Sequence, residues 1–234
     1  CSSLIDFLLR TTIYNGGDYH ISADNMPYSL VEELRRDENT SKISTMQYIG
    51  YAPVKNDNAN KPYFYVGAAD EEMFASMPVH LTSGRLPQND AEIILPEHYY
   101  NYGGESYGIG DVIILEIGDR TEDGSIFYQR NPFVTPEDGG KEEFTPRQKL
   151  TYTVVGTYER PNFEPYSAPG YTALTMQNVG AQSGNFSAYV KLDKASSSIL
   201  EDFINQHGLG EYGTQINWDL LSLSGVFEFN NFST

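Results

Sequence analysis

The residues of this chain that could do chemistry are four histidines, one cysteine and 32 carboxylates. The chain has no Gly-x-Ser-x-Gly nucleophile elbow, and its one cysteine is Cys1, so no cysteine–histidine pair can form away from the N-terminus. No two histidines stand four residues apart, which is the spacing by which one helix binds zinc. We therefore expect structural or solvated roles for His20, His80, His98 and His207.

The acidic segments offer oxygen ligands but no recognisable metal site. Calcium takes about six to eight oxygens, usually from one compact loop. Asn56–Asn60 comes closest, but it lacks the glycine turn and the closing glutamate of an EF-hand loop, and Asp119–Asp123 and Glu137–Asp138 are weaker candidates. Two carboxylates could also hydrolyse a glycosidic bond, but among 32 acidic residues some pairs approach by chance. We expect no catalytic residue, no metal and no cofactor.

A tyrosine-rich stretch, YYNYGGESYG, is the candidate ligand contact, since aromatic faces can bind a glycan or a peptide. The same residues could equally fill a core, and the sequence does not decide between these roles. The tyrosines concerned are Tyr99, Tyr100, Tyr102 and Tyr107.

The composition excludes some partners. A formal net charge of -17 and a pI near 4.4 argue against nucleic acid, whose phosphates require clustered Lys and Arg, and against an anionic lipid surface. Eighteen Tyr and twelve Phe argue against general disorder, which is usually poor in aromatic residues.

The elements that must position these residues follow from hydrophobic periodicity. The first part of the chain predicts strands and helices in alternation, with Asp24 or Asn25 as the helix cap before Pro27. Lys55–Lys61 is expected to be a polar loop. The expected elements are strand Asp18–Ala23, helix Tyr28–Asp37, strands Ile43–Val54 and Pro62–Ala68, and helix Glu71–Met77.

From Pro78 to about Gly184 the pattern changes to short strands separated by long turns. Glu137–Gln148 is a polar break in which we expect mobility. Strand Asn185–Leu192 and helix Ala195–His207 follow, and Gln215–Leu223 is either a last strand or a lead back toward a membrane. The expected short strands are Glu92–Leu95, Asp111–Ile117, Ile126–Gln129, Lys149–Thr157 and Tyr171–Met176.

Three segments together resemble a family signature. They are LTSGRLPQNDAEIIL at Leu81–Leu95, GDVIIL at Gly110–Leu115, and YTVVGT at Tyr152–Thr157. Their order and spacing resemble the extracytoplasmic core domain of MacB/FtsX-type ABC transporter permeases, over about residues 14–225. The signature residues are Gly84, Arg85, Leu86, Pro87, Glu92, Gly110, Asp111, Val155 and Gly156.

The signature residues have folding roles by their types alone. Gly84 gives a turn conformational freedom, Arg85 can pair with an acidic neighbour, and Pro87 fixes the exit from the turn. Gly110-Asp111 is expected to form a tight turn into a strand. The signature therefore predicts architecture and no reaction.

The resemblance implies an α+β fold in which a porter-like α/β subdomain, residues 14–80 and 185–225, is interrupted by a mostly β insertion, residues 81–184. It implies a non-catalytic extracellular domain of a permease subunit in the cell membrane, coupling membrane-helix motion to cargo or partner engagement. ATP hydrolysis would belong to a separate cytoplasmic ATPase subunit or domain. Its other partners would be its own membrane helices, a second permease copy, and extracellular peptide, lipid or protein cargo.

The two ends of the sequence are apolar. Ser3–Ile13 has a helical pattern without a start signal, and Val226–Phe232 is rich in aromatic residues. We expect residues 1–13 to continue a first membrane helix and residues 226–234 to lead into a second. Two alternatives stay open: a surface lipoprotein, lipidated at Cys1, that binds glycan or peptide, and a secreted hydrolase.

Overall fold

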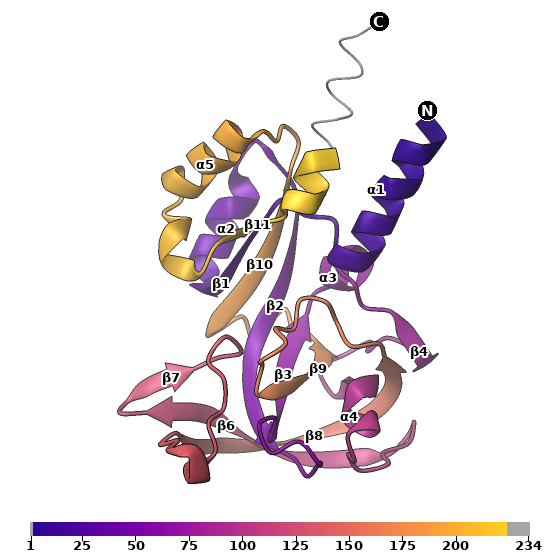
Figure 1. Cartoon of the computed structure of the whole chain (residues 1–234), viewed down its shortest axis with the longest axis vertical. Coiled ribbons are helices and arrows are strands. Elements are labelled where there is room, and N and C mark those ends of the chain that lie inside the picture. Colours follow the sequence, from indigo (N-terminus) through magenta and orange to yellow (C-terminus); the bar gives the residue numbers. More distant parts are fainter. Residues whose placement is uncertain (1, 224–234) are drawn as a thin grey trace, which may run out of the picture. The chain divides into compact units, whose positions relative to one another are not determined.

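A computed structural model describes residues 2–223 of the chain. These residues form two compact units (Figure 1). Unit 1 contains the described residues up to Gln47, Asp70–Pro78, and the described residues from Ala181 onward. Unit 2 contains Tyr48–Ala69 and Val79–Gly180. Helices and strands alternate in the chain and the strands pair in both directions, so the expected α+β class is confirmed.

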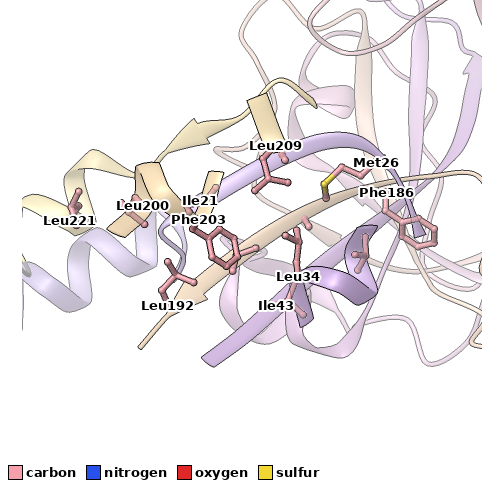
Figure 2. Close-up of a cluster of buried hydrophobic side chains, with 14 residues drawn as sticks. Ile21, Met26, Leu34, Ile43, Phe186, Leu192, Leu200, Phe203, Leu209 and Leu221 are labelled. Atoms are coloured by element: carbon pink, nitrogen blue, oxygen red, sulfur yellow. The ribbon is translucent and has the colours of Figure 1, made fainter. Parts of the chain in front are cut away.

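Unit 1 is a small antiparallel sheet covered by helices. Its strand order is β11-β1-β10-β2, where only the first part of β2 belongs to this unit. Val31 and Leu34 of α2 and Leu200 and Phe203 of α5 are buried in one cluster with the side chains of β1 and β10 (Figure 2). The bounds are β1 Ile21–Pro27, α2 Tyr28–Arg36, β2 Thr40–Pro53, β10 Asn185–Leu192, α5 Ser197–Gln206 and β11 Gln215–Ile216.

The expected helix cap before α2 is wrong. The N-cap position is Pro27, which makes no side-chain cap bond. Asp24 and Asn25 lie instead in a bulge of β1, where the pairing with β10 shifts between Ala23 and Met26 and Asn25 adopts φ 57°. Asn tolerates this left-handed conformation better than most residues. Asp24 and Asn25 therefore form the bulge of β1 and do not cap α2.

Two further helices belong to unit 1. The first, α1 (Ser2–Gly16), exposes Leu4, Phe7 and Leu8. The second, α3 (Glu71–Ser76), begins at Asp70, whose carboxylate accepts a hydrogen bond from Met73 N at 2.8 Å. The same carboxylate accepts from Thr45 Oγ1 at 2.7 Å, so one residue both caps α3 and fixes it to β2.

Unit 2 is a sheet that closes on itself. The strand order is β2-β3-β9-β5-β8-β6, and β6 meets β2 again through a single pair, Tyr51 with Gly118. Alternate side chains point inward, so Ile93, Ile113 and Val154 share one core with the aromatic Phe64. The bounds are β3 Tyr63–Ala69, β4 Leu81–Gly84, β5 Glu92–Pro96, α4 Glu97–Asn101, β6 Val112–Glu122, β7 Ser125–Phe127, β8 Glu143–Tyr158 and β9 Gly170–Met176.

The expected mobile break at Glu137–Gln148 is wrong for its second half. β8 begins at Glu143, and its polar start pairs with β6 from Thr121↔Glu143 to Ile117↔Gln148. The preceding residues form a 3-10 turn, Pro136–Asp138. Most of residues 143–149 are exposed, so the segment shows no apolar alternation from which a strand could be predicted.

The two units divide the chain differently from the expected subdomains. Residues 48–69 were expected in the first subdomain with 14–80, but they group with 79–180 in unit 2. The physical reason is β2, a continuous strand of 14 residues that contributes to both units. At the other end, Gln215–Leu223 contains the short β11 and then a helical segment, residues 218–223, rather than one strand.

Candidate functional site

The signature residues come together in unit 2 around β8. Gly84 ends β4 with φ 72°, and a Cβ atom at this position would lie 2.1 Å from Val155 O. Arg85 N donates to the same Val155 O at 3.0 Å. At Gly156, a Cβ atom would lie 2.6 Å from Arg85 O. Only glycine fits such a close approach of two backbones, so Gly84 and Gly156 permit the antiparallel pairing of β4 with β8, in which these two residues are partners.

Arg85 pairs with the acidic residue seven positions later. Its Nη1 donates to Glu92 Oε1 at 2.8 Å and its Nη2 contacts Glu92 Oε2, while Nη1 also donates to Leu86 O at 3.1 Å. Glu92 Oε1 accepts from Gln88 N at 2.8 Å as well. The Arg85 hydrogen bond, followed by that from Gln88 N, lowers the pKa of Glu92 to about 2. The pair closes the turn that contains Pro87 and leads into β5.

Gly110 and Asp111 form the second turn against β8. Gly110 N donates to Val154 O at 2.7 Å, and Val154 N donates to Asp111 O at 2.8 Å. The Asp111 carboxylate accepts from Gly108 N at 2.7 Å. Both turns therefore attach to Val154–Gly156, and their side chains are engaged with each other or with backbone. This arrangement fixes two turns to β8 and so helps to build the fold.

The tyrosine cluster is mostly packed. Tyr99 is fully buried, with ring centroids 4.6 Å from Phe64 and 5.4 Å from Tyr171, so of the two roles that the sequence leaves open it fills the core. The Tyr100 hydroxyl donates to Tyr107 O at 2.8 Å. Burial raises the pKa of Tyr100 and of Tyr107 to about 12. Tyr102, with 56% of its surface exposed, is the member that a ligand could reach.

A buried ionic cluster in unit 2 was missed by the sequence analysis. The side chain of Glu164 is completely buried and lies 2.7 Å from His98 Nε2, 3.1 Å from Lys61 Nζ and 3.4 Å from Arg160 Nε. Thr172 donates to Glu164 Oε1 through both its N and its Oγ1, each at 2.8 Å. Burial alone would raise the pKa of Glu164, but the bond from His98 and the cations lower it.

The cluster joins separate loops of unit 2. Lys61 belongs to the loop before β3, His98 to α4, and Arg160 and Glu164 to the segment between β8 and β9. Glu164 is occupied by donors on both oxygens. It is therefore a structural anion and not a free general acid or base. The local sequence does not predict this ionic cluster, because Lys61 and Glu164 are 103 positions apart.

A second cluster lies in unit 1, between α1 and β1. We call Gly17–His20 the junction. Asp18 N donates to Ser76 O at 2.9 Å and His20 N to Val190 O at 2.8 Å. The Asp18 carboxylate binds Lys42 Nζ at 2.5 Å and also contacts Lys191 Nζ. Burial alone would raise the pKa of Asp18, but these two lysines lower it.

The junction is also bonded to the last part of the described chain. Asn217 Nδ2 donates to Tyr19 O at 2.9 Å and to Gly17 O at 3.3 Å, and Asn217 N donates to His20 O at 2.9 Å. The Asn217 side chain also accepts from Leu220 N at 3.4 Å, at the start of the helical residues 218–223. The end of α1 and the start of this helical segment are thus held by one residue.

The histidines whose contacts are described have structural roles. His20 is buried and its Nδ1 accepts from Leu192 N at 3.0 Å, and burial, reinforced by Lys191, lowers its pKa to about 4. His207 ends α5 and bonds Asp37 Oδ2 at 2.7 Å and Glu33 Oε2 at 3.1 Å. Among residues 2–223, no group of three or more His, Asp or Glu side chains is placed to hold a metal ion.

No protein-family model matches the chain, and no curated protein is a significant match. Several solved structures are similar to it. The periplasmic region of MacB from Actinobacillus actinomycetemcomitans is 11% identical with a TM-score of 0.49, over 97% of this chain and 99% of that one. The extracellular domain of YknZ, a noncanonic ABC-type transporter from Gram-positive bacteria, is 7% identical with a TM-score of 0.44, over 83% of this chain and 98% of that one.

A domain of a protein named as a permease from Porphyromonas gingivalis is 10% identical with a TM-score of 0.38, over 88% of each chain. These proteins are of the kind that the signature residues resemble. At such identities and TM-scores the likeness carries no argument about what this chain binds or does. Within residues 2–223, none of the helices combines the length and the apolar character that a membrane span requires. Cys1 and residues 226–234 lie outside the described residues.

Proposed function

We propose that this chain is the extracytoplasmic domain of an ABC transporter permease subunit, held between the first and second membrane helices. Its task is to pass force from those helices to cargo or to a partner outside the cell. ATP is hydrolysed by a separate cytoplasmic subunit or domain, since this sequence has no phosphate-binding Gly-x-x-x-x-Gly-Lys-Ser/Thr loop. The cargo is a peptide, a lipid or a protein, and a second permease copy is a further partner.

The observation that carries this proposal is the bond between Asn217 and the junction. Asn217 and Gly17 are 200 positions apart, yet the Asn217 side chain holds the backbone on both sides of Asp18. A displacement of α1 therefore pulls on the segment that leads into residues 218–223, and the reverse. A domain that responds to the relative motion of two membrane helices needs such a link between the segments that follow the first helix and precede the second.

The surface of α1 supports a position beside a membrane. Leu4, Phe7 and Leu8 are 62%, 61% and 41% exposed, and Tyr14 further along is 56% exposed. Apolar side chains gathered on one exposed helix mark a contact with lipid or with another apolar surface. The signature turns around β8 support the proposal through the architecture they build.

The location is tested by labelling. In the full-length protein, with Cys1 replaced by serine, Val179→Cys places one thiol at a residue that is 80% exposed. A membrane-impermeant maleimide is expected to label it in intact spheroplasts. Labelling only after lysis would overturn the extracytoplasmic placement. Incorporation of labelled fatty acid that depends on Cys1, in a protein without flanking membrane helices, would support the lipoprotein alternative instead.

The coupling is tested by distances. Spin labels at Tyr14 and Trp218, both 56% exposed, report on α1 and on the helical segment after Asn217. In the complete transporter, the distance distribution is expected to change between the nucleotide-free state and the state trapped with ADP and vanadate. Asn217→Asp keeps the acceptor for Leu220 N but removes both side-chain bonds to the junction, so it is expected to broaden both distributions. An identical distribution in the two states would refute the coupling.

A further inference from the structure

The edge of β6 has an open stretch. On one side, β6 pairs with β8 from Val112↔Thr153 to Thr121↔Glu143. On its other side, it meets β2 only at Gly118 and β7 only from Arg120 onward. Among residues 2–223, no strand therefore pairs with Val112–Ile117 on the side turned away from β8.

The sequence explains why β2 does not cover this edge. The pair Tyr51↔Gly118 in an antiparallel ladder brings Pro53 toward Glu116. Proline has no N–H to donate and is confined to the ends and edges of sheets. β2 ends at Pro53, and Val54 N donates to Pro62 O at 3.0 Å, on the side of β3 and not of β6.

The open stretch is nevertheless a regular strand. Ile113, Leu115 and Ile117 are at most 5% exposed and pack into the core of unit 2. Between them, Val112 and Ile114 are 64% and 68% exposed, across from Thr153 and Thr151 of β8. An ordered edge that displays β-branched residues is a template for another strand, and proteins usually cover or blunt such edges.

The charges around this edge indicate the chemistry of what binds there. Asp111 precedes Val112, and Glu116 follows Ile114 on the same face, while Lys149 stands opposite Glu116. The chain as a whole carries -17. A second copy would bring the same excess of carboxylates, whereas a basic partner would be attracted.

We propose that the edge Val112–Ile117 binds an extended segment of another polypeptide, in which apolar residues alternate with Lys or Arg. The segment adds to the sheet as a strand beside β6: main-chain hydrogen bonds supply affinity, and side chains facing Val112 and Ile114 supply specificity. The proposal depends on unit 2 alone, so it stands or fails independently of the transporter function.

The test uses the whole chain and an eight-residue peptide, acetyl-(Val-Lys)4-amide, with binding followed by calorimetry. Binding is expected, together with slower amide hydrogen exchange at Val112–Glu116. The same peptide with N-methyl groups on alternate residues keeps its charge but loses main-chain donors, and it should bind about tenfold or more weakly. The isomer with four valines followed by four lysines has the same composition and charge as the alternating peptide but lacks its side-chain alternation. Its binding should be weakened to a similar extent.

A protein variant completes the test. The double variant Val112→Lys/Ile114→Lys places two positive charges on the open edge. Its affinity for the alternating peptide is expected to fall about tenfold or more. Val134→Lys with Val179→Lys adds the same charge at two other exposed apolar residues of unit 2 and should bind with little change, after a small correction for charge. Unchanged far-UV circular dichroism checks that both variants fold.

Three results would overturn the proposal. The first is no binding of the alternating peptide. The second is equal binding of the methylated or block peptides, which would indicate ionic attraction to an acidic protein. The third is concentration-dependent dimerisation, seen by sedimentation and lost in Val112→Lys/Ile114→Lys, which would assign the edge to a second copy.

Discussion

The two units are stabilised in different ways. In unit 1, aliphatic side chains of two helices pack on an antiparallel sheet. Unit 2 instead contains buried charged side chains. Among residues 2–223, the buried Lys, Arg, Asp and Glu residues are Lys61, Arg120 and Glu164, and all three belong to unit 2. The difference follows from the connections, since unit 2 contains long segments without regular structure that must be fixed to the sheet.

Arg120 shows how one buried charge orders a long segment. Its guanidinium donates to Glu142 Oε1 at 2.6 Å, to Tyr128 O at 2.8 Å and to Asn131 O at 2.8 Å. It therefore holds both ends of the connection between β7 and β8. A short apolar turn would need no such tie, but a polar segment of this length cannot bury enough surface to order itself.

Removing the buried carboxylate of unit 2 is expected to have the largest effect. Glu164→Gln keeps the shape but leaves Lys61 and Arg160 without a counterion, which should destabilise unit 2 by about 3–5 kcal/mol. Since the pKa of Glu164 is lowered by its partners, its stabilisation is present at neutral pH and is lost as the pH falls below the ordinary range of a carboxyl group. Urea unfolding at pH 7 measures the loss.

The matched controls are an exposed acid and a double variant. Glu105→Gln changes an exposed carboxylate of the same unit and should stay within about 0.5 kcal/mol of wild type. Lys61→Met with Glu164→Gln removes one stranded cation and should recover part of the loss. If the single variant were as stable as wild type, the cluster would be incidental to the fold.

An aliphatic truncation in unit 1 is expected to cost somewhat less and to behave differently with pH. Leu34 of α2 is completely buried in the core of Figure 2. Leu34→Ala should destabilise unit 1 by about 3 kcal/mol through lost burial and a residual cavity. The loss should be the same at pH 5 and pH 7, because no charge is involved. Fluorescence of the single tryptophan, Trp218, reports on this unit.

The strongly lowered pKa of a buried histidine in unit 1 gives a third, smaller effect. The pKa of His20 is lowered to about 4 by burial and by Lys191, against the opposing charge of Asp18. The folded state therefore keeps His20 neutral while the unfolded state takes up a proton below about pH 6.5. Stability is complete above that pH and falls as the pH is lowered toward 4.

Between pH 7 and pH 5 the loss should be about 1–2 kcal/mol in wild type. In His20→Asn this contribution is expected to vanish, because the amide oxygen can accept from Leu192 N and does not titrate. Unfolding at the two pH values measures the difference. Equal pH dependence in both proteins would assign the effect to other groups.

The sequence predicts unit 1 better than unit 2, and particular residues show why. Strand Asn185–Leu192 was predicted with its observed bounds, and helix Tyr28–Asp37 differs by one residue, because each carries a regular apolar repeat. The polar start of β8 carries none, since most of its side chains are exposed.

The candidate sites also differ in how well the sequence predicts their contacts. An acidic partner for Arg85 was expected, and Glu92 is close enough in sequence to be a natural candidate. The contacts of Glu164 and of Asn217 could not be predicted, because their partners are 103 and 200 positions away. Periodicity reports which face of an element is buried, but not which distant loop supplies a counterion.

The smallest expected effect concerns a polar tie of unit 1 between segments that are 200 positions apart. Asn217→Asp removes the two donor bonds to Gly17 O and Tyr19 O but keeps an acceptor for Leu220 N, and a negative charge is favourable at the start of a helix. The net loss of stability should be about 1 kcal/mol. Amide exchange should quicken in the junction and at the end of α1, while the core strands of unit 1 keep their protection. If exchange quickened equally throughout unit 1, Asn217 would be part of the general packing of that unit and not a separate link between two of its segments.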